Sequence, residues 1–252
     1  MSTTTTTREE APLDISTLSE EERKDLIIAD TVSIASDTNL AVSTPPFTLT
    51  KTLLINARGI GIVRPFISTS ERSISVTKPD GTLLYTSTRA QSCSGTCTLT
   101  DAEENRLIGT EYFFGPGRDP VLQRLDREGC EIKTLSKWTS RNHIFMLPDG
   151  RTCEWRYKRE KGFGSGGATG TALLLSVQGV RAAQLIRNDE TRTLGSKSCS
   201  AGNGGELQLG EDVGGKMGVE EDVVVATCLL MLKKEMDRRR CVQLIVPAAI
   251  IL

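Results

Sequence analysis

Residues 223–232 constrain the fold more than any other feature, because this run carries no charge and is apolar on every face of a helix. Acidic residues fill 220–222 and five cations follow within 233–240, an order that suits the two ends of a helix dipole. Good helix formers without Gly or Pro continue to Arg240, which predicts a helix over about 220–243. Its apolar part spans about 15 Å, roughly half a bilayer. A helix that is apolar all round is buried all round, so we expect protein to enclose it.

The chain between residues 50 and 215 alternates apolar and polar side chains with the period of a β-strand. Short intervals separate these runs, and the turns include Pro-Asp-Gly at both 79–81 and 148–150. We predict a mainly β fold with one buried C-terminal helix, in which about 10–12 strands form an antiparallel β-barrel around the central hydrophobic helix. The alternation is clearest at 73–77, 96–100, 153–158 and 206–209.

The two ends of the chain differ from this body. Residues 1–50 carry three cations and nine acids, a net of −6, so the rest carries +5 of the chain's net −1. Ser and Thr are abundant there and apolar residues sparse, which predicts a disordered acidic arm over 1–48. Within it, Ser19 and Glu22 have the spacing of a capping box that begins a short helix. We assign 49–246 to the barrel domain and 247–252 to an apolar tail.

Composition excludes several function classes. The net charge of −1 argues against nucleic acid, and no run reaches the ~20 apolar residues of a membrane span. Seven scattered cysteines and an N-terminus without an apolar stretch predict reduced thiols in a cytoplasmic chain. His143 is the single histidine, so multi-His metal sites and most His-based triads are excluded, and its place beside Ile144 and Phe145 predicts a structural role. We predict no cofactor and no metal.

Two glycine-rich runs invite a comparison with phosphate-binding loops. Gly162–Gly167 has the G-x-G-x-x-G spacing, but a charged strand precedes it and 172–177 after it has the pattern of a strand. We therefore predict a flexible loop there, and another at Gly202–Gly205. The aromatic residues Trp138, Trp155 and Tyr157 are predicted to pack in the core, with a ligand-flanking role as the alternative.

The candidate binding residues lie on one basic strand, which holds five cations against two acids in 151–161. Arginine offers a planar fork that suits a phosphate, and alternate residues of the strand share a face. The competing interpretation is a solvated outer face that keeps the strand from aggregating. The predicted ligand residues, for a phosphate group, are Arg151, Arg156, Lys158, Arg159 and Lys161.

A second cationic run, Lys233–Arg240, follows the apolar part of the predicted helix. It has three interpretations: contact with an anionic membrane, a cap on the mouth of the barrel, or a plain solvated helix end. Asp237 and Glu235 stand at helical spacing from its arginines, which favours the solvated helix end.

The arrangement of strands followed by one apolar helix resembles the tubby C-terminal-like superfamily, whose branches include tubby, the phospholipid scramblases and the LURP-one-related proteins. The likeness covers about 60–245 and is closest to uncharacterised members from filamentous fungi. The calcium-binding acidic motif and the cysteine cluster of scramblases have no clear counterpart here. The residues that carry the resemblance are Ser-Arg-Asn-His-Ile-Phe (140–145), Pro-Asp-Gly-Arg (148–151), Glu-Trp-Arg-Tyr-Lys (154–158), Ile-Arg-Asn-Asp-Glu (186–190) and the helix 221–240.

The resemblance implies a barrel wrapped around a central helix and, from tubby, binding of phosphoinositide headgroups by basic residues of the barrel wall. The first hypothesis is therefore a non-enzymatic module that binds anionic phospholipid peripherally. The alternative is a soluble protein-interaction or stress-response scaffold, with partners on the N-terminal arm or the apolar tail. An enzyme is the third hypothesis, for which the sequence holds no recognisable catalytic constellation.

Overall fold

The computed structural model describes residues 13–31, 47–61, 71–91, 94–197, 200–215 and 218–250. Residues 1–12 and 32–46 of the predicted arm, and residues 251–252 of the predicted tail, lie outside the described residues. Among the described residues, two α-helices and twelve strands form the fold. The helices are α1 (Glu20–Thr31) and α2 (Glu221–Ile250). The strands are β1 (Leu49–Asn56), β2 (Ser73–Thr77), β3 (Leu83–Arg89), β4 (Cys97–Asp101), β5 (Arg106–Glu111), β6 (Val121–Arg124), β7 (Glu131–Thr134), β8 (His143–Met146), β9 (Thr152–Lys161), β10 (Thr169–Val177), β11 (Val180–Ile186) and β12 (Glu206–Gly210).

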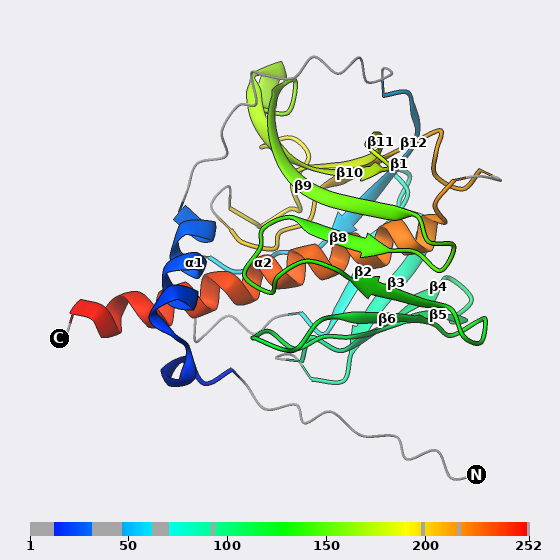
Figure 1. The fold of residues 1–252 in the computed structure, drawn as a ribbon. Helices are drawn as coiled ribbons and strands as arrows, with labels where there is room; N and C mark the ends of the chain where they lie inside the picture. Colours follow the sequence, from blue (N-terminus) through cyan, green and yellow to red (C-terminus); the bar gives the residue numbers. More distant parts are fainter. Residues whose placement is uncertain are drawn as a thin grey trace, which may run out of the picture.

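The strands form a closed antiparallel barrel in which each pairs with its neighbours in sequence and β1 closes the ring against β12. This confirms the predicted fold class, and Figure 1 shows α2 running through the barrel. Alternation along each strand explains the arrangement, because one side chain in two points inward. In β9, for example, Cys153 and Trp155 are buried while Arg156 is exposed.

Both Pro-Asp-Gly runs form turns, as predicted, and the two turns have the same hydrogen bonds. In each, the glycine has positive φ, +87° at Gly81 and +83° at Gly150. The aspartate carboxylate accepts from the backbone N–H two residues later, at 2.8 Å from Asp80 and 2.9 Å from Asp149. These Asx contacts fix the hairpins that close β2–β3 and β8–β9.

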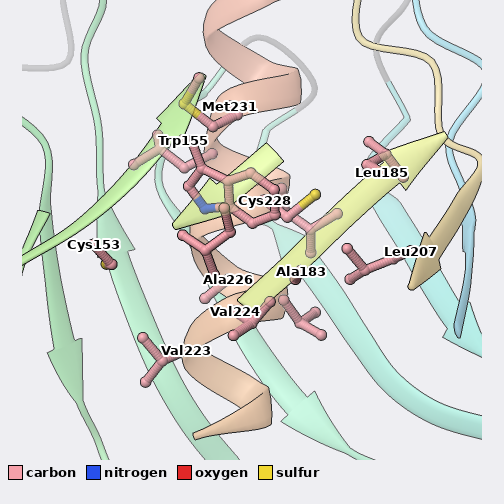
Figure 2. Packing of buried hydrophobic residues seen from close by; sticks show 14 of the residues in the cluster. Cys153, Trp155, Ala183, Leu185, Leu207, Val223, Val224, Ala226, Cys228 and Met231 are labelled. Atoms are coloured by element: carbon pink, nitrogen blue, oxygen red, sulfur yellow. The ribbon is translucent and has the colours of Figure 1, made fainter. Parts of the chain in front are cut away.

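The apolar half of α2 fills the barrel. Val224, Val225 and Cys228 have no exposed surface, and the inward residues of the strands surround them (Figure 2). Trp155 of β9 packs there as well, and its indole N–H donates to the Thr227 hydroxyl at 2.9 Å. Within the described ranges, no helix is both long and apolar enough to cross a bilayer.

Charged side chains close the end of the barrel where α2 begins. Glu221 accepts from Lys51 at 2.7 Å and from the Tyr85 hydroxyl at 3.0 Å. Arg124 pairs with Glu220 and Asp222, which lie at the start of the helix. The acidic first turn of α2 is thus held by cations of the barrel wall, in keeping with the sign of the helix dipole.

Helix α2 is longer than predicted and meets part of the N-terminal segment. It reaches Ile250 instead of about 243, which takes the helix into the predicted tail. Its end emerges from the barrel and α1 crosses it (Figure 1). The predicted disordered arm is therefore corrected over α1 and the residues just before it, because Leu18 and Leu26 are buried against Val242 and its neighbours in α2.

The start of α1 has the predicted capping box. The Ser19 hydroxyl accepts from the Glu22 backbone N–H at 3.2 Å, and the Glu22 carboxylate accepts from the Ser19 backbone N–H at 3.0 Å. Two otherwise unsatisfied helix-terminal donors are thereby used. Where it meets α2, this short helix packs in one cluster with the apolar residues Cys241, Val242 and Ile245.

Candidate functional site

The five cations predicted to bind a headgroup do not converge. Arg151 lies in the turn before β9, where it pairs with Asp149 at 2.6 Å. Five residues along a strand, roughly 17 Å, separate it from Arg156. Lys158 shares the outer face with Arg156 but pairs with Glu160 at 2.6 Å. The other two cations, Arg159 and Lys161, are exposed near the end of β9 and alternate with Lys158 and Glu160.

A polar pocket of about 430 Å³ lies where the second half of α2 faces the β9–β10 hairpin and the loop after β11. We call it the mouth pocket. Three arginines from two well-separated loops contribute to its lining, together with two aromatic side chains and one carboxylate of α2. The residues on which the argument depends are Arg141, Tyr157, Arg187, Arg192, Asn203 and Glu235.

Arg187 and Glu235 form the innermost charged pair of the mouth pocket, at 2.7 Å. Burial alone would raise the pKa of the Glu235 carboxyl, but the nearby Arg187 guanidinium outweighs it and the pKa is lowered. Arg187 also contacts the Asn203 side-chain oxygen at 3.3 Å. Both charges are therefore kept at neutral pH, and the pair ties α2 to the loop that follows β11.

Tyr157 provides an aromatic surface for two of the arginines. The Arg141 guanidinium lies 4.9 Å from the ring centroid and that of Arg187 lies 5.8 Å from it, both in the range of cation–π contacts. The Tyr157 hydroxyl is buried and has no hydrogen-bond partner among the described residues. Burial raises its pKa to about 12, so at neutral pH the hydroxyl keeps its proton and has a donor to offer.

The glycine-rich run Gly162–Gly167 lies in the predicted loop, between β9 and β10, and its residues 163–165 line one wall of the mouth pocket. The Gly166 backbone N–H donates to the Glu190 carboxylate at 2.8 Å, and the Ser165 hydroxyl contacts Asp189 at 3.1 Å. These bonds tie the β9–β10 hairpin to the loop after β11. Strand β10 follows, as expected, so the run does not open the helix that a dinucleotide site needs.

The run Gly202–Gly205 also lies in a loop, which packs closely because it passes directly over α2. Gly202 has φ +71°, and a Cβ atom there would stand 2.6 Å from the Leu232 carbonyl oxygen. Only glycine permits this approach. The close passage places the buried Asn203 where it contacts Arg187.

We expect Gly202→Ala to destabilise the protein by more than Gly150→Ala. Both positions have positive φ, which costs an alanine about 1–2 kcal/mol. A Cβ at Gly150 meets nothing within 4 Å, whereas one at Gly202 also clashes with α2. Urea unfolding of the two variants measures the difference, and equal losses would contradict the close approach of the 202–205 run to the helix.

The cationic second half of α2 is not a solvated helix end, and that prediction is corrected. Lys233, Lys234 and Arg238 are 1–3% exposed, and of the three interpretations only the cap on the barrel mouth agrees with this burial. The backbone oxygen of Ser140 accepts from Arg238 at 2.8 Å and from the His143 Nε2 at 3.0 Å. The i, i+4 spacing correctly indicated pairing within the helix, since Lys233 and Asp237 lie 2.7 Å apart. It did not indicate that strands enclose this part of the helix.

His143 is buried in β8, as the prediction of a structural role required. Its Nδ1 faces the Lys234 ammonium at 3.2 Å, while Nε2 donates to Ser140. Burial, together with Lys234 and Arg238, lowers the pKa of His143 to about 2. The ring is therefore neutral and joins β8 to the central helix. Of the aromatic residues predicted for the core, Trp155 is central, whereas Tyr157 lines the mouth pocket.

The mouth pocket was missed because its residues come from distant parts of the chain. A signal was present, since 140–145, 154–158, 186–190 and 221–240, which carry the tubby-like resemblance, each contribute a residue to it. In the part of the chain that the structure describes, no group of three His, Cys, Asp or Glu is placed to hold a metal ion. No family model, curated protein or solved structure matches this chain, so the resemblance stays a prediction.

Proposed function

We propose that this protein is a non-enzymatic binding module whose mouth pocket holds a phosphate group, carried by the headgroup of an anionic phospholipid. The observation that carries the proposal is the convergence on one pocket of Arg141, from the β7–β8 loop, with Arg187 and Arg192, from the loop after β11. The first two of these arginines lie over the Tyr157 ring. Arginine is the residue best suited to phosphate, because its planar fork matches two oxygens at once.

The charge balance of the mouth pocket favours an anion. Its lining holds three arginines against the carboxylates of Asp189 and Glu235, which leaves one positive charge in excess. Each carboxylate is already paired, Glu235 with Arg187 and Asp189 with Arg192. Because both carboxylates hold arginines in place, the arrangement is organised before a ligand arrives, which reduces the cost of binding.

The surroundings of the mouth pocket favour a membrane as the source of the phosphate. Arg159 and Lys161 are exposed on the strand that leads into the wall of the pocket at Phe163 and Gly164. Cations near an anionic membrane contribute about 1 kcal/mol each. Two of the five cations predicted from sequence are thus assigned a supporting role beside the pocket, while Arg156 and Lys158 lie on the outer face of the barrel.

We expect the double variant Arg141→Gln/Arg192→Gln to bind phosphoinositide-containing vesicles at least about tenfold more weakly than the wild type. Loss of two charge-assisted contacts of about 1.5–3 kcal/mol each is ample for this effect. Co-sedimentation across a salt series measures it. Arg187 is not replaced, because without it the buried Glu235 carboxylate would lose its ion-pair partner.

The matched control is Arg156→Gln/Lys158→Gln, which removes the same charge from the outer face of β9 and should change binding less than twofold. Titration with inorganic phosphate separates a free phosphate ligand from a lipid headgroup. Equal losses in the two double variants, or no preference for anionic over neutral vesicles at low salt, would contradict the proposal. The latter result would favour the protein-interaction hypothesis.

A further inference from the structure

The β7–β8 loop, residues 135–142, connects the mouth pocket to helix α1. Near its middle, Trp138 packs against the cluster formed by Leu18 and Leu26 of the N-terminal segment and Val242 and its neighbours of α2. Phe114 meets the Trp138 ring edge-on, with centroids 5.1 Å apart. The ring therefore lies in the interface where α1 docks.

Polar contacts hold the start of α1 beside this interface. The Glu22 carboxylate completes the capping box of α1 with Ser19. Hydrogen bonds from Ser19 lower the pKa of the Glu22 carboxyl. The start of α1 is therefore fixed next to the cluster that Trp138 joins.

The loop passes from α1 to the mouth pocket within one tight turn. The Ser140 backbone N–H donates to the Lys137 carbonyl at 3.0 Å, so this turn contains Trp138. Ser140 is anchored in addition by Arg238 of α2. The next residue is Arg141, whose guanidinium lies over the Tyr157 ring in the pocket. Trp138, which packs in the α1 interface, and Arg141, which lines the mouth pocket, are therefore three positions apart in the sequence.

We propose that the docking of α1 positions Arg141 in the mouth pocket, so that the N-terminal segment regulates phosphate binding. The inference rests on the proposed function of the pocket. When α1 is docked, Trp138 is packed in the interface and the β7–β8 loop holds Arg141 against Tyr157. When α1 is released, Trp138 loses this packing and the loop is free to move. Because coupling between two sites is reciprocal, a bound phosphate must also strengthen the docking of α1.

The contact that holds α1 is small, which suits a regulated element. It has two buried leucines, Leu26 of α1 and Leu18 just before the helix, while Ile28 of α1 is 55% exposed. Short helices gain most of their stability from such packing. A modification of the N-terminal segment, or a partner that binds it, would therefore change phosphate binding in the mouth pocket without contacting the barrel.

The test uses the full chain with inorganic phosphate as the probe. In Leu18→Ala/Leu26→Ala, hydrogen exchange should show fast exchange of α1 amides and unchanged protection of the barrel strands. The Kd for phosphate should rise at least about fivefold, the lower end of typical coupling. Ile28→Ala, an equally apolar change on the exposed face of α1, should leave the Kd unchanged. Phosphate should slow exchange of α1 amides in the wild type.

The outcomes separate this inference from the function on which it rests. A wild type that binds neither inorganic phosphate nor phosphoinositide-containing vesicles overturns both. If only the vesicles bind, the same comparison of variants is made with vesicle binding. Binding that Arg192→Gln weakens, but that release of α1 leaves unchanged, overturns the coupling alone. The coupling is also overturned if phosphate does not change the exchange rate of α1 amides in the wild type. This measurement does not depend on whether the variants fold.

Discussion

Replacing Trp155 by alanine is expected to destabilise the protein by about 3–5 kcal/mol, the cost of removing a large aromatic side chain from a packed core. Trp155 has no exposed surface and joins β9 to the central helix through its hydrogen bond to Thr227. Figure 2 shows the indole between the strand and α2. The barrel closes around α2, so a void at this place weakens the packing of helix and strand together.

The control is Trp155→Phe, which keeps a ring in the core and removes the indole N–H. Thr227 still donates to the Val223 carbonyl oxygen at 2.8 Å, so it is not left without a partner. We expect a loss of about 1–3 kcal/mol, clearly smaller than for alanine. Urea unfolding measures both variants. A loss below about 1 kcal/mol for Trp155→Ala would mean that the barrel does not pack tightly against the helix.

The barrel and its central helix were predictable because local patterns specify them. Alternation at 73–77 or 153–158 determines which side chains point inward, and the Pro-Asp-Gly turns set where strands reverse. An apolar helix such as 223–232 has no stable place except inside protein. Because these local signals agree, they predict the barrel even when the pair of strands that closes it is not known.

Residues whose role depends on distant partners were not predictable in the same way. Lys234 has the spacing of a solvated helix cation, and only the enclosure by β8 and its neighbours buries it. Lys158 has the alternation of a binding residue, and Glu160 neutralises it locally. Arg141 and Arg187 lie 46 positions apart in the sequence, and the barrel brings both to one aromatic ring.

The N-terminal segment differs from its composition for a related reason. The abundance of Ser and Thr in 1–48 predicts disorder, since such a segment has little apolar surface to bury. Two leucines and a capping box are enough to form α1, because the apolar surface of α2 is already in place for the leucines to pack against. The proposed coupling to the mouth pocket depends on this contact, which becomes visible only when both ends of the chain are placed.

Stability is expected to fall by about 2 kcal/mol between pH 7 and pH 5 because of His143 alone. In the folded protein, burial and the neighbouring Lys234 and Arg238 lower the pKa of this imidazole from 6.5 to about 2. The unfolded chain binds a proton below pH 6.5 and the folded chain does not, so stability rises with pH across this window and is lost as the pH falls. The expected slope approaches about 1.4 kcal/mol per pH unit below pH 6.

The window from pH 7 to 5 isolates this group, because His143 is the single histidine and few other side chains of an unfolded chain titrate there. The lowered pKa of Lys234, about 7 and caused chiefly by burial, changes stability between pH 7 and 10.5 instead. The matched control is His143→Gln, whose amide offers both a donor for Ser140 and an acceptor for Lys234 without titrating. Urea unfolding at pH 7, 6 and 5 should show the slope in the wild type and its loss in the variant. Equal slopes in the two proteins would mean that the imidazole takes up its proton in the folded state, and that the contact between β8 and the central helix is more open to water than its 0% exposure implies.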